Sequence, residues 1–232
     1  MLYKISNGAN IPLLDSVDLT EWASPVEDQQ HLGSCTAQAI VGAYELLLKK
    51  NYSEQFVDLS RLFVYYNSRL LENYVNEDVG AYVHNGIKAV DRFGVCKESI
   101  WPYNIHMFAV EPTNIAYNEA NNRKLKFYSK VDNPTQIIEA LDNGLPVVIG
   151  VFLFDGFDQV TKSSPILAMP RAEEETDGGH AMCVTGYDKQ KELFKVRNSF
   201  GTNWGENGYC YITFDYAQDY FNDCWTFDIL LK

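Results

Sequence analysis

The chain has 232 residues, and its 31 acidic and 19 basic side chains give it a formal charge of −12. A chain of this length can bury one large hydrophobic core or two lobes that share an interface. The negative charge repels phosphate groups, so we expect no nucleic-acid partner. Residues 145–154 form the longest apolar run, about half the length of a membrane-spanning helix, so we expect no membrane insertion.

Polar residues, glycine and proline interrupt residues 1–15, so we expect no signal peptide. As encoded, the chain is then cytoplasmic, unless it is a processed mature form. No two cysteines form a Cys-x-x-Cys pair; they are Cys35, Cys96, Cys183, Cys210 and Cys224. An odd number of scattered cysteines favours reduced thiols over disulfides or zinc ligands, so we expect no metal site.

The hydrophobic periodicity changes character near residue 130. Apolar spacing typical of helices covers residues 34–50, 59–72 and 82–93, and Ser34 is the expected N-cap of the first. A short helix over 134–143 is followed by predicted strands over 147–154, 181–187, 193–198 and 209–214. Residues 155–179 show no clear periodicity, which is typical of a functional or mobile connection.

Cys35 lies in the first turn of the first predicted helix, directly after Gly33-Ser34. The positive end of a helix dipole stabilises a thiolate, which is the nucleophilic form of cysteine. The alternative is a small buried residue, because free cysteines are commonly inert and packed in cores. A nucleophilic role therefore requires a base nearby.

His180 is the histidine best placed to be that base, because Gly178-Gly179 leaves its approach open. If the strands over 181–187 and 193–198 form a hairpin, residues whose numbers add up to 378 lie opposite each other, which places His180 across from Asn198. A slip of two residues would keep the faces but separate this pair. The alternative is that the two residues merely begin and end strands.

Gln29 precedes Cys35 by six residues in a polar turn. Its side-chain amide can donate to an oxyanion beside Cys35, together with the backbone N–H of Cys35. For Gln29 alone, a solvated turn residue is the simpler interpretation. Taken together, Cys35, His180 and Asn198 supply a nucleophile, a base and an amide that orients the base.

Three ordered blocks resemble the papain-like cysteine peptidases. They are the segment from Gln29 to Cys35, the segment Gly178-Gly179-His180-Ala181, and the block from Asn198 to Tyr209. His180 follows Cys35 by 145 residues and Asn198 follows it by 163, which is similar to the separation in that family. The resemblance begins near Val17 and ends near Phe214.

The resemblance implies an α+β fold of two lobes with the active-site cleft between them. A mainly helical lobe over residues 15–130 carries the nucleophile, and an antiparallel β-sheet or barrel lobe over 131–232 carries the histidine and asparagine. Residues 1–14 form an N-terminal extension, and whether terminal segments cross between the lobes stays open.

The resemblance also implies a cysteine-type endopeptidase that acts on protein or peptide substrates through a thioester, as a monomer and without a cofactor. The catalytic residues it implies are Cys35, His180, Asn198 and Gln29. We assign substrate contacts to Gly80, Gly178, Gly179 and Trp204; a glycine lets a substrate backbone approach closely, although Gly80 can also be a simple turn.

Some positions depart from the family pattern. Leu32 and Thr36 stand where the family has a cysteine three residues before the nucleophile and a tryptophan after it, so one disulfide is absent. Phe200 replaces the tryptophan that shields the bond between Asn198 and His180, so we expect weaker shielding. Such changes resemble the bacterial or viral branch. The long propeptide is missing, which implies either a mature form or an enzyme made without a zymogen.

Two other functions stay open at this stage. A Cys-His amidase or transglutaminase-like acyl transferase would use the same nucleophile, although the Asn198 block and Gln29 argue against it. A catalytically silent papain-fold module that only binds proteins is the second, and the intact Cys35 and His180 argue against it. An acidic run over residues 173–177 can attract basic substrates, although a solvated loop is the simpler account.

Overall fold

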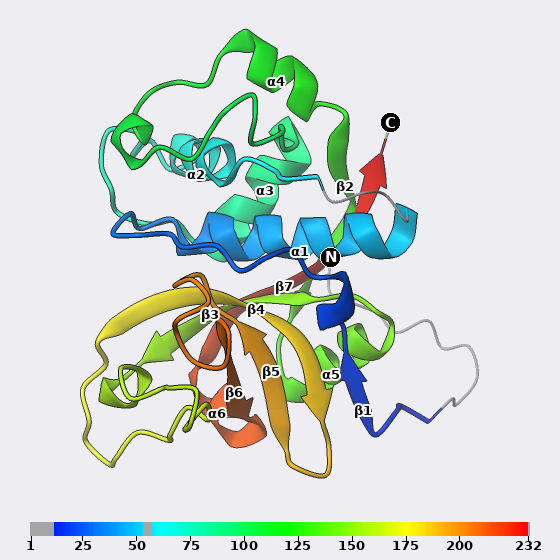
Figure 1. Ribbon diagram of the computed structural model, residues 1–232, viewed down its shortest axis with the longest axis vertical. Helices are drawn as coiled ribbons and strands as arrows, with labels where there is room; N and C mark the ends of the chain where they lie inside the picture. The colour runs from blue at the N-terminus through cyan, green and yellow to red at the C-terminus, as the bar shows by residue number, and fades with distance from the viewer. Residues whose placement is uncertain (1–11, 53–56, 232) are drawn as a thin grey trace.

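The computed structural model describes residues 12–52 and 57–231, and it confirms the predicted α+β fold of two lobes. Figure 1 shows a helical half above, a sheet with short helices below, and α1 between them. In chain order, the elements up to residue 120 are β1 (Ser16–Asp18), η1 (Thr20–Trp22), α1 (Cys35–Tyr52), α2 (Arg61–Leu70), α3 (Val83–Phe93), η2 (Ile105–Met107) and α4 (Asn114–Ala120). The elements after residue 120 are β2 (Arg123–Val131), α5 (Pro134–Asp142), β3 (Val147–Leu153), η3 (Asp155–Phe157), β4 (Gly178–Asp188), β5 (Leu193–Arg197), β6 (Tyr209–Thr213), α6 (Phe214–Tyr220) and β7 (Phe221–Leu231).

The helix ends follow local chemistry. Ser60 caps α2 by accepting a hydrogen bond from the N–H of Phe63, and α3 ends at Gly94, whose φ of 80° suits glycine. A Cβ at Gly94 would lie 1.9 Å from the carbonyl oxygen of Ala120, so no larger residue fits. Ser34 stands directly before α1 as predicted, and its carbonyl accepts the first helical bond from the N–H of Gln38 at 3.0 Å. Its hydroxyl bonds to the phenol of Tyr103 at 2.6 Å.

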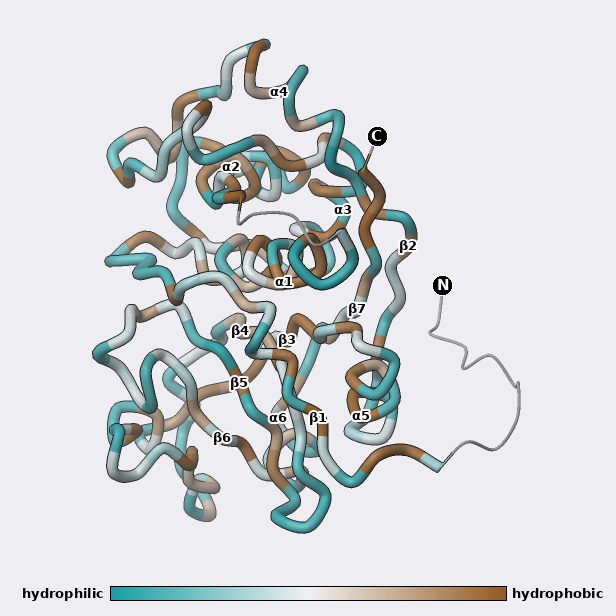
Figure 2. The backbone as a smooth tube through the Cα atoms, turned by 45° about the vertical axis from the view of Figure 1, so that its right-hand side comes forward, coloured by the Kyte–Doolittle hydropathy of each residue, from teal (hydrophilic) through white to brown (hydrophobic). Residues whose placement is uncertain are grey.

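Helix α1 is buried on all sides rather than along one face. Every residue from Thr36 to Leu48 is buried. Ile40 and Tyr44 belong to the core of the helical half, whereas Leu46 belongs to the core of the sheet half. Figure 2 shows apolar stretches in the helices above and in the strands below α1, as expected when one helix closes two cores.

The sheet is antiparallel throughout, in the order β2-β7-β3-β4-β5-β6, and β1 also pairs with β4. The predicted hairpin register was wrong, because Val184 pairs with Val196 and not with Phe194. The turn between the strands is longer than predicted, since Asp188 pairs with Leu193. A register shift between Val184 and Gly186 follows, and the pairs beyond it lie two residues from the predicted register. Gly186 is required there, since a Cβ would lie 2.5 Å from the carbonyl oxygen of Val17.

Strands β2 and β7 contribute to both cores. Leu125, Phe227 and Ile229 pack with the helices, whereas Val131 and Cys224 pack in the sheet half. The end of β7 therefore lies beside the helical half in Figure 1. Of the predicted N-terminal extension, residues 1–11 lie outside the described part of the chain. No helix within residues 12–52 and 57–231 has the length and apolar character that a membrane crossing requires.

A buried ion pair joins α1 to α2. Glu45 accepts two hydrogen bonds from the guanidinium of Arg61, at 2.9 and 2.7 Å, and also one from the N–H of Leu59 at 2.9 Å. Both side chains are almost completely buried. Asp58 also accepts from the guanidinium at 2.7 Å, so the buried charge of Glu45 depends on Arg61, whereas Arg61 has a second carboxylate beside it.

We therefore expect Glu45→Ala to destabilise the protein by about 3 kcal/mol, because it leaves Asp58 as the remaining close carboxylate of the buried Arg61 and removes the acceptor of the buried Leu59 N–H. Chemical denaturation with two spectroscopic probes measures this loss. Asp132→Ala is the control, since this exposed carboxylate pairs with the exposed Lys130 and the substitution should change stability little. Equal effects of the two substitutions would show that the buried pair is not what joins these helices.

Candidate active site

Cys35 begins helix α1 and faces β4 across the boundary between the two halves. Burial opposes ionisation of its thiol. The hydrogen bond and positive charge of His180, with the N–H groups of Ala181 and Thr36, outweigh burial and hold the pKa of Cys35 below its ordinary value. A thiol in these surroundings loses its proton more readily than a free cysteine does.

His180 is buried in β4 and responds in the opposite direction. Burial disfavours its cationic form, but the bond and charge of Cys35, followed by the bond to Asn198, raise its pKa above the ordinary value. Each member of the pair thus favours the charged form of the other. Both shifts move the pair toward a thiolate beside an imidazolium.

Asn198 fixes the ring of His180. Its Oδ1 lies 2.7 Å from Nε2 of His180, and both residues are buried. This bond leaves Nδ1 of the ring for the bond with Cys35. The observed pairing of Val184 with Val196 is two residues from the predicted register, yet His180 and Asn198 still meet. They can do so because Asn198 lies beyond the end of β5, where its N–H donates to the carbonyl of Gly208.

Aromatic rings cover this pair. The ring of Phe200 lies 5.1 Å from that of His180 and the ring of Phe157 lies 5.7 Å from it. Trp204, predicted to contact substrate, instead packs 5.1 Å from Phe157 and is not among the residues that line the cleft. Sequence reasoning missed Phe157, because it lies in the stretch without periodicity, where an aromatic residue beside Gly156 was the only signal.

Gln29 is buried, so the solvated-turn interpretation was wrong. Its Nε2 donates to the carbonyl of Leu32 at 3.0 Å, and its Oε1 accepts from the hydroxyl of Ser199 at 2.6 Å. The phenol of Tyr103 donates to the Gln29 carbonyl at 2.9 Å. These contacts fix the amide and leave its second N–H for a ligand beside the nucleophile.

Cys35 and His180 open into a cleft of about 620 Å³. Its lining includes Gly80 and Gly179; a Cβ built at Gly179 or at the neighbouring Gly178 meets nothing within 4 Å. Four large side chains of the lining are exposed: Tyr74, Val79, Tyr82 and Phe152.

Sequence reasoning did not find Asn222 and Asp223, which also line the cleft from β7. An extended chain can therefore lie against open backbone between apolar side chains.

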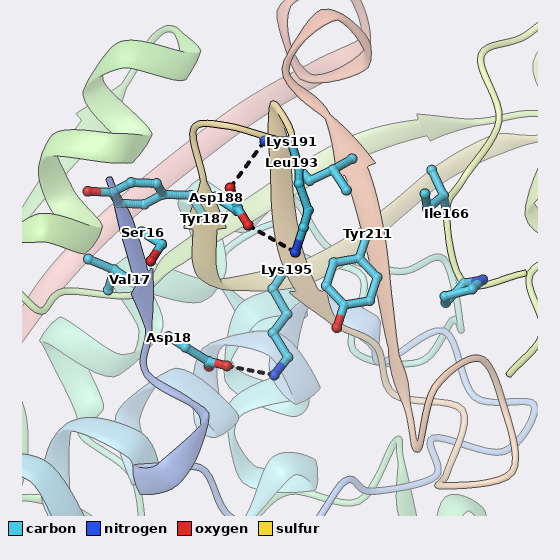
Figure 3. A pocket seen from close by; sticks show the side chains of 11 residues that line it. Ser16, Val17, Asp18, Ile166, Tyr187, Asp188, Lys191, Leu193, Lys195 and Tyr211 are labelled. Atoms are coloured by element: carbon cyan, nitrogen blue, oxygen red, sulfur yellow. Dashed lines mark hydrogen bonds and ion pairs between the residues drawn. The ribbon is translucent and has the colours of Figure 1, made fainter. Parts of the chain in front are cut away.

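A second depression, of about 440 Å³, lies in the sheet half (Figure 3). There Lys195 pairs with Asp18 at 2.8 Å, and Lys191 pairs with Asp188 at 3.0 Å. The described residues that line it include no cysteine or histidine. This site therefore lacks the chemistry of the cleft.

The remaining cysteines are unlike Cys35. Burial raises the pKa of Cys96, Cys183 and Cys224 to about 12, and it also raises that of Cys210. All five cysteines are free. Within residues 12–52 and 57–231, no group of three histidine, cysteine or acidic side chains is arranged to hold a metal ion.

A two-lobed fold with a cysteine and a histidine facing each other at a cleft is the arrangement of a thiol peptidase. The profile described as papain family cysteine protease matches residues 13–225, and the chain belongs to that family. Xylellain, a cysteine protease from Xylella fastidiosa, has a similar structure, with a TM-score of 0.87 and 30% identity, over 94% of this chain and 87% of that chain.

The curated relatives include a viral protein and an amoebic one. An uncharacterized peptidase C1-like protein of Acanthamoeba polyphaga mimivirus is 40% identical over 203 residues, which cover 83% of this chain and 65% of that protein. Cysteine proteinase 2 of Entamoeba histolytica is 29% identical over 208 residues, covering 86% and 64% respectively. The chain thus spans less than two thirds of the length of these two relatives.

The opposite pKa shifts predict that one thiol reacts in mildly acidic solution. Iodoacetamide should label Cys35 with a rate that rises through its lowered pKa, whereas the other four thiols stay protonated at that pH. Mass spectrometry of the labelled peptides measures this selectivity, and Cys35→Ala is the control that should abolish it. Slow labelling spread evenly over the cysteines would contradict the ion pair.

Asn198→Ala should shift the pH dependence of this labelling to higher pH. The bond from His180 to Asn198 raises the pKa of the ring, so its loss lowers that pKa and weakens the imidazolium that stabilises the thiolate. We expect the rise in labelling rate to move upward by about one pH unit. Asn203→Ala is the control, because Asn203 is an exposed amide in the same block and its loss should leave the pH profile unchanged. An unshifted pH profile for Asn198→Ala would contradict the role of Asn198 in orienting His180.

Proposed function

We propose that this chain is a cysteine-type endopeptidase that hydrolyses peptide bonds through a thioester acyl-enzyme. The observation that carries the proposal is the placement of Cys35 and His180 together in the lining of the cleft, with Oδ1 of Asn198 2.7 Å from the ring of His180; the opposite pKa shifts of the two residues support it. Membership of the papain family supports a peptidase activity. The substrates are proteins or peptides, because the cleft exposes both open backbone and large apolar side chains.

In the first step, the Sγ thiolate of Cys35 attacks the carbonyl carbon of the scissile peptide bond. The carbonyl oxygen gains negative charge, and the N–H of Cys35 and the second N–H of the Gln29 amide donate to it. The buried amide of Gln29 is already fixed by Leu32 and Ser199, so it needs little reorganisation when this charge develops.

The imidazolium of His180 then gives its proton to the leaving amine as the C–N bond breaks. This step leaves a thioester on Cys35 and a neutral ring on His180. A water molecule next loses a proton to His180 and attacks the thioester carbon. The C–S bond breaks, the acid product leaves, and the thiolate and imidazolium are restored. Asn198 keeps the ring turned toward the sulfur in both steps.

Gly80, Gly178 and Gly179 are the residues that we propose for main-chain contacts with substrate. Gly80 has a φ of 75°, which larger residues rarely adopt, and Gly178 and Gly179 present open space above the strand. Trp204 supports the aromatic cover of His180 through Phe157 in this proposal. No step requires a metal ion or an organic cofactor.

Incubation with an unstructured protein substrate tests the proposal. The wild-type chain should cut at internal positions, and Cys35→Ala should lower the rate by at least about a thousandfold, because the nucleophile is removed. Mass spectrometry of products formed with an added amine separates hydrolysis from acyl transfer. Transfer products in place of free acids would support the transglutaminase-like alternative. Substrate binding without any cleavage would instead support the silent binding module.

A further inference from the structure

Residues 71–82 form the connection between α2 and α3, and we refer to them as the cleft loop. The loop supplies one wall of the cleft, including Gly80 and the exposed ring of Tyr82. It contains no helix or strand of its own. A wall of this kind needs contacts from other elements to hold a fixed distance from Cys35.

Asp78 provides a direct contact between the cleft loop and residues 33–35, which we refer to as the nucleophile segment. The N–H of Gly33 lies 3.0 and 3.2 Å from the two carboxylate oxygens of Asp78. Gly33 precedes Cys35 by two residues, so this contact reaches the backbone that enters α1. The approach is close, since a Cβ at Gly33 would lie 3.3 Å from the backbone nitrogen of Gly80.

Tyr65 of α2 completes the connection from the buried side. Its phenol donates a hydrogen bond to Asp78 and accepts one from the N–H of Gly80 at 3.2 Å. Burial, and then Asp78, raise the pKa of this phenol, so it keeps the proton that it donates. One donor and one acceptor position of Tyr65 are thus used on two residues of the same loop.

Arg69 shapes the loop from within. Its Nη1 donates to the carbonyls of Val75 at 2.8 Å and Glu77 at 2.9 Å, and its side chain is completely buried. The guanidinium lies 4.0 Å from the centre of the Tyr65 ring, where a cation strengthens the phenol as a donor. The loop is therefore fixed at Glu77 from one side and at Asp78 and Gly80 from the other.

We propose that Asp78 and Tyr65 are positioning residues for substrate binding. They hold Gly80 at a set distance from the nucleophile segment, so that a substrate main chain bound at Gly80 presents its carbonyl to Cys35. The connection between the cleft loop and the nucleophile segment contains no disulfide, since all five cysteines are free, and it therefore relies on these hydrogen bonds. This inference rests on the proposed function, because it assigns a role in peptide binding at the same cleft.

Asp78→Ala tests the proposal against the neighbouring Glu77→Ala as its control. Glu77 is exposed and loses the same charge, whereas its backbone contact with Arg69 is unchanged by the substitution. We expect Asp78→Ala to raise the KM for a peptide substrate by about tenfold to a hundredfold, with kcat much less affected. Labelling of Cys35 by iodoacetamide, which needs no contact with Gly80, should keep its wild-type rate.

Tyr65→Phe removes one hydroxyl and should reproduce the rise in KM. The double substitution should raise KM by less than the two single effects combined, because both variants lose the bond between Tyr65 and Asp78, although Tyr65→Phe also removes the acceptor of the Gly80 N–H. Asp78→Asn keeps an oxygen for the Gly33 N–H and should restore most of the affinity. An unchanged KM in Asp78→Ala, or additive effects in the double variant, would overturn the proposal. An equal loss of iodoacetamide labelling would show a structural role at Cys35 instead.

Peptide binding by Cys35→Ser variants separates this inference from the proposed function. Without turnover, calorimetric titration measures affinity alone, and adding Asp78→Ala should weaken it by the same factor as the change in KM. If the wild-type chain cleaves nothing and this titration still shows the loss, the peptidase assignment fails and the positioning role stands. Equal affinity with and without Asp78 would reject the positioning role, whatever the activity.

Discussion

The burial of α1 between the two cores is the constraint on which the rest of the structure depends. The helix has no solvent-facing side from Thr36 to Leu48, so it can neither rotate nor slide without opening one of the cores. Its N-terminal residue, Cys35, is therefore fixed where α1 meets β4. The sheet half is ordered by the same packing, because Leu46 belongs to its core.

This placement gives the thiol and the imidazole their unusual charge balance. Burial alone would favour a neutral thiol and a neutral ring, since charge is costly away from water. The mutual hydrogen bond and attraction of Cys35 and His180 reverse both tendencies. Asn198 bonds to the ring, and the rings of Phe157 and Phe200 pack against it. Neither half of the molecule carries this chemistry alone.

The sequence predicted the α+β organisation, because helical and strand periodicities occupy different parts of the chain. It also brought Cys35, His180 and Asn198 together as candidates, and the structure places Cys35 and His180 in the lining of one cleft with Asn198 bonded to the ring. The hairpin register was wrong, because the turn is longer than predicted, with Asp188 paired to Leu193. The further register shift before Gly186 lies where Val17 approaches closely, a contact between distant segments. Strand β7 was not predicted, since Cys224 to Phe227 are buried on both faces and do not alternate.

Other parts of the site depend on contacts that local pattern does not contain. Gln29 is buried because Ser199 and Tyr103, far along the chain, bond to it. Phe157 reaches His180 from a stretch without periodicity. The contact of Asp78 with Gly33 joins residues 45 positions apart through an acidic side chain that sequence reasoning had no ground to select.

The ionisation of Cys35 in the resting protein is the quantity on which this account stands. Ultraviolet difference absorbance between the wild-type chain and Cys35→Ser, followed over pH, measures the thiolate directly. The account predicts a thiolate band at neutral pH that disappears only on acidification well below the ordinary thiol pKa of about 8.5. A band that grows in only on approaching that ordinary pKa would contradict it.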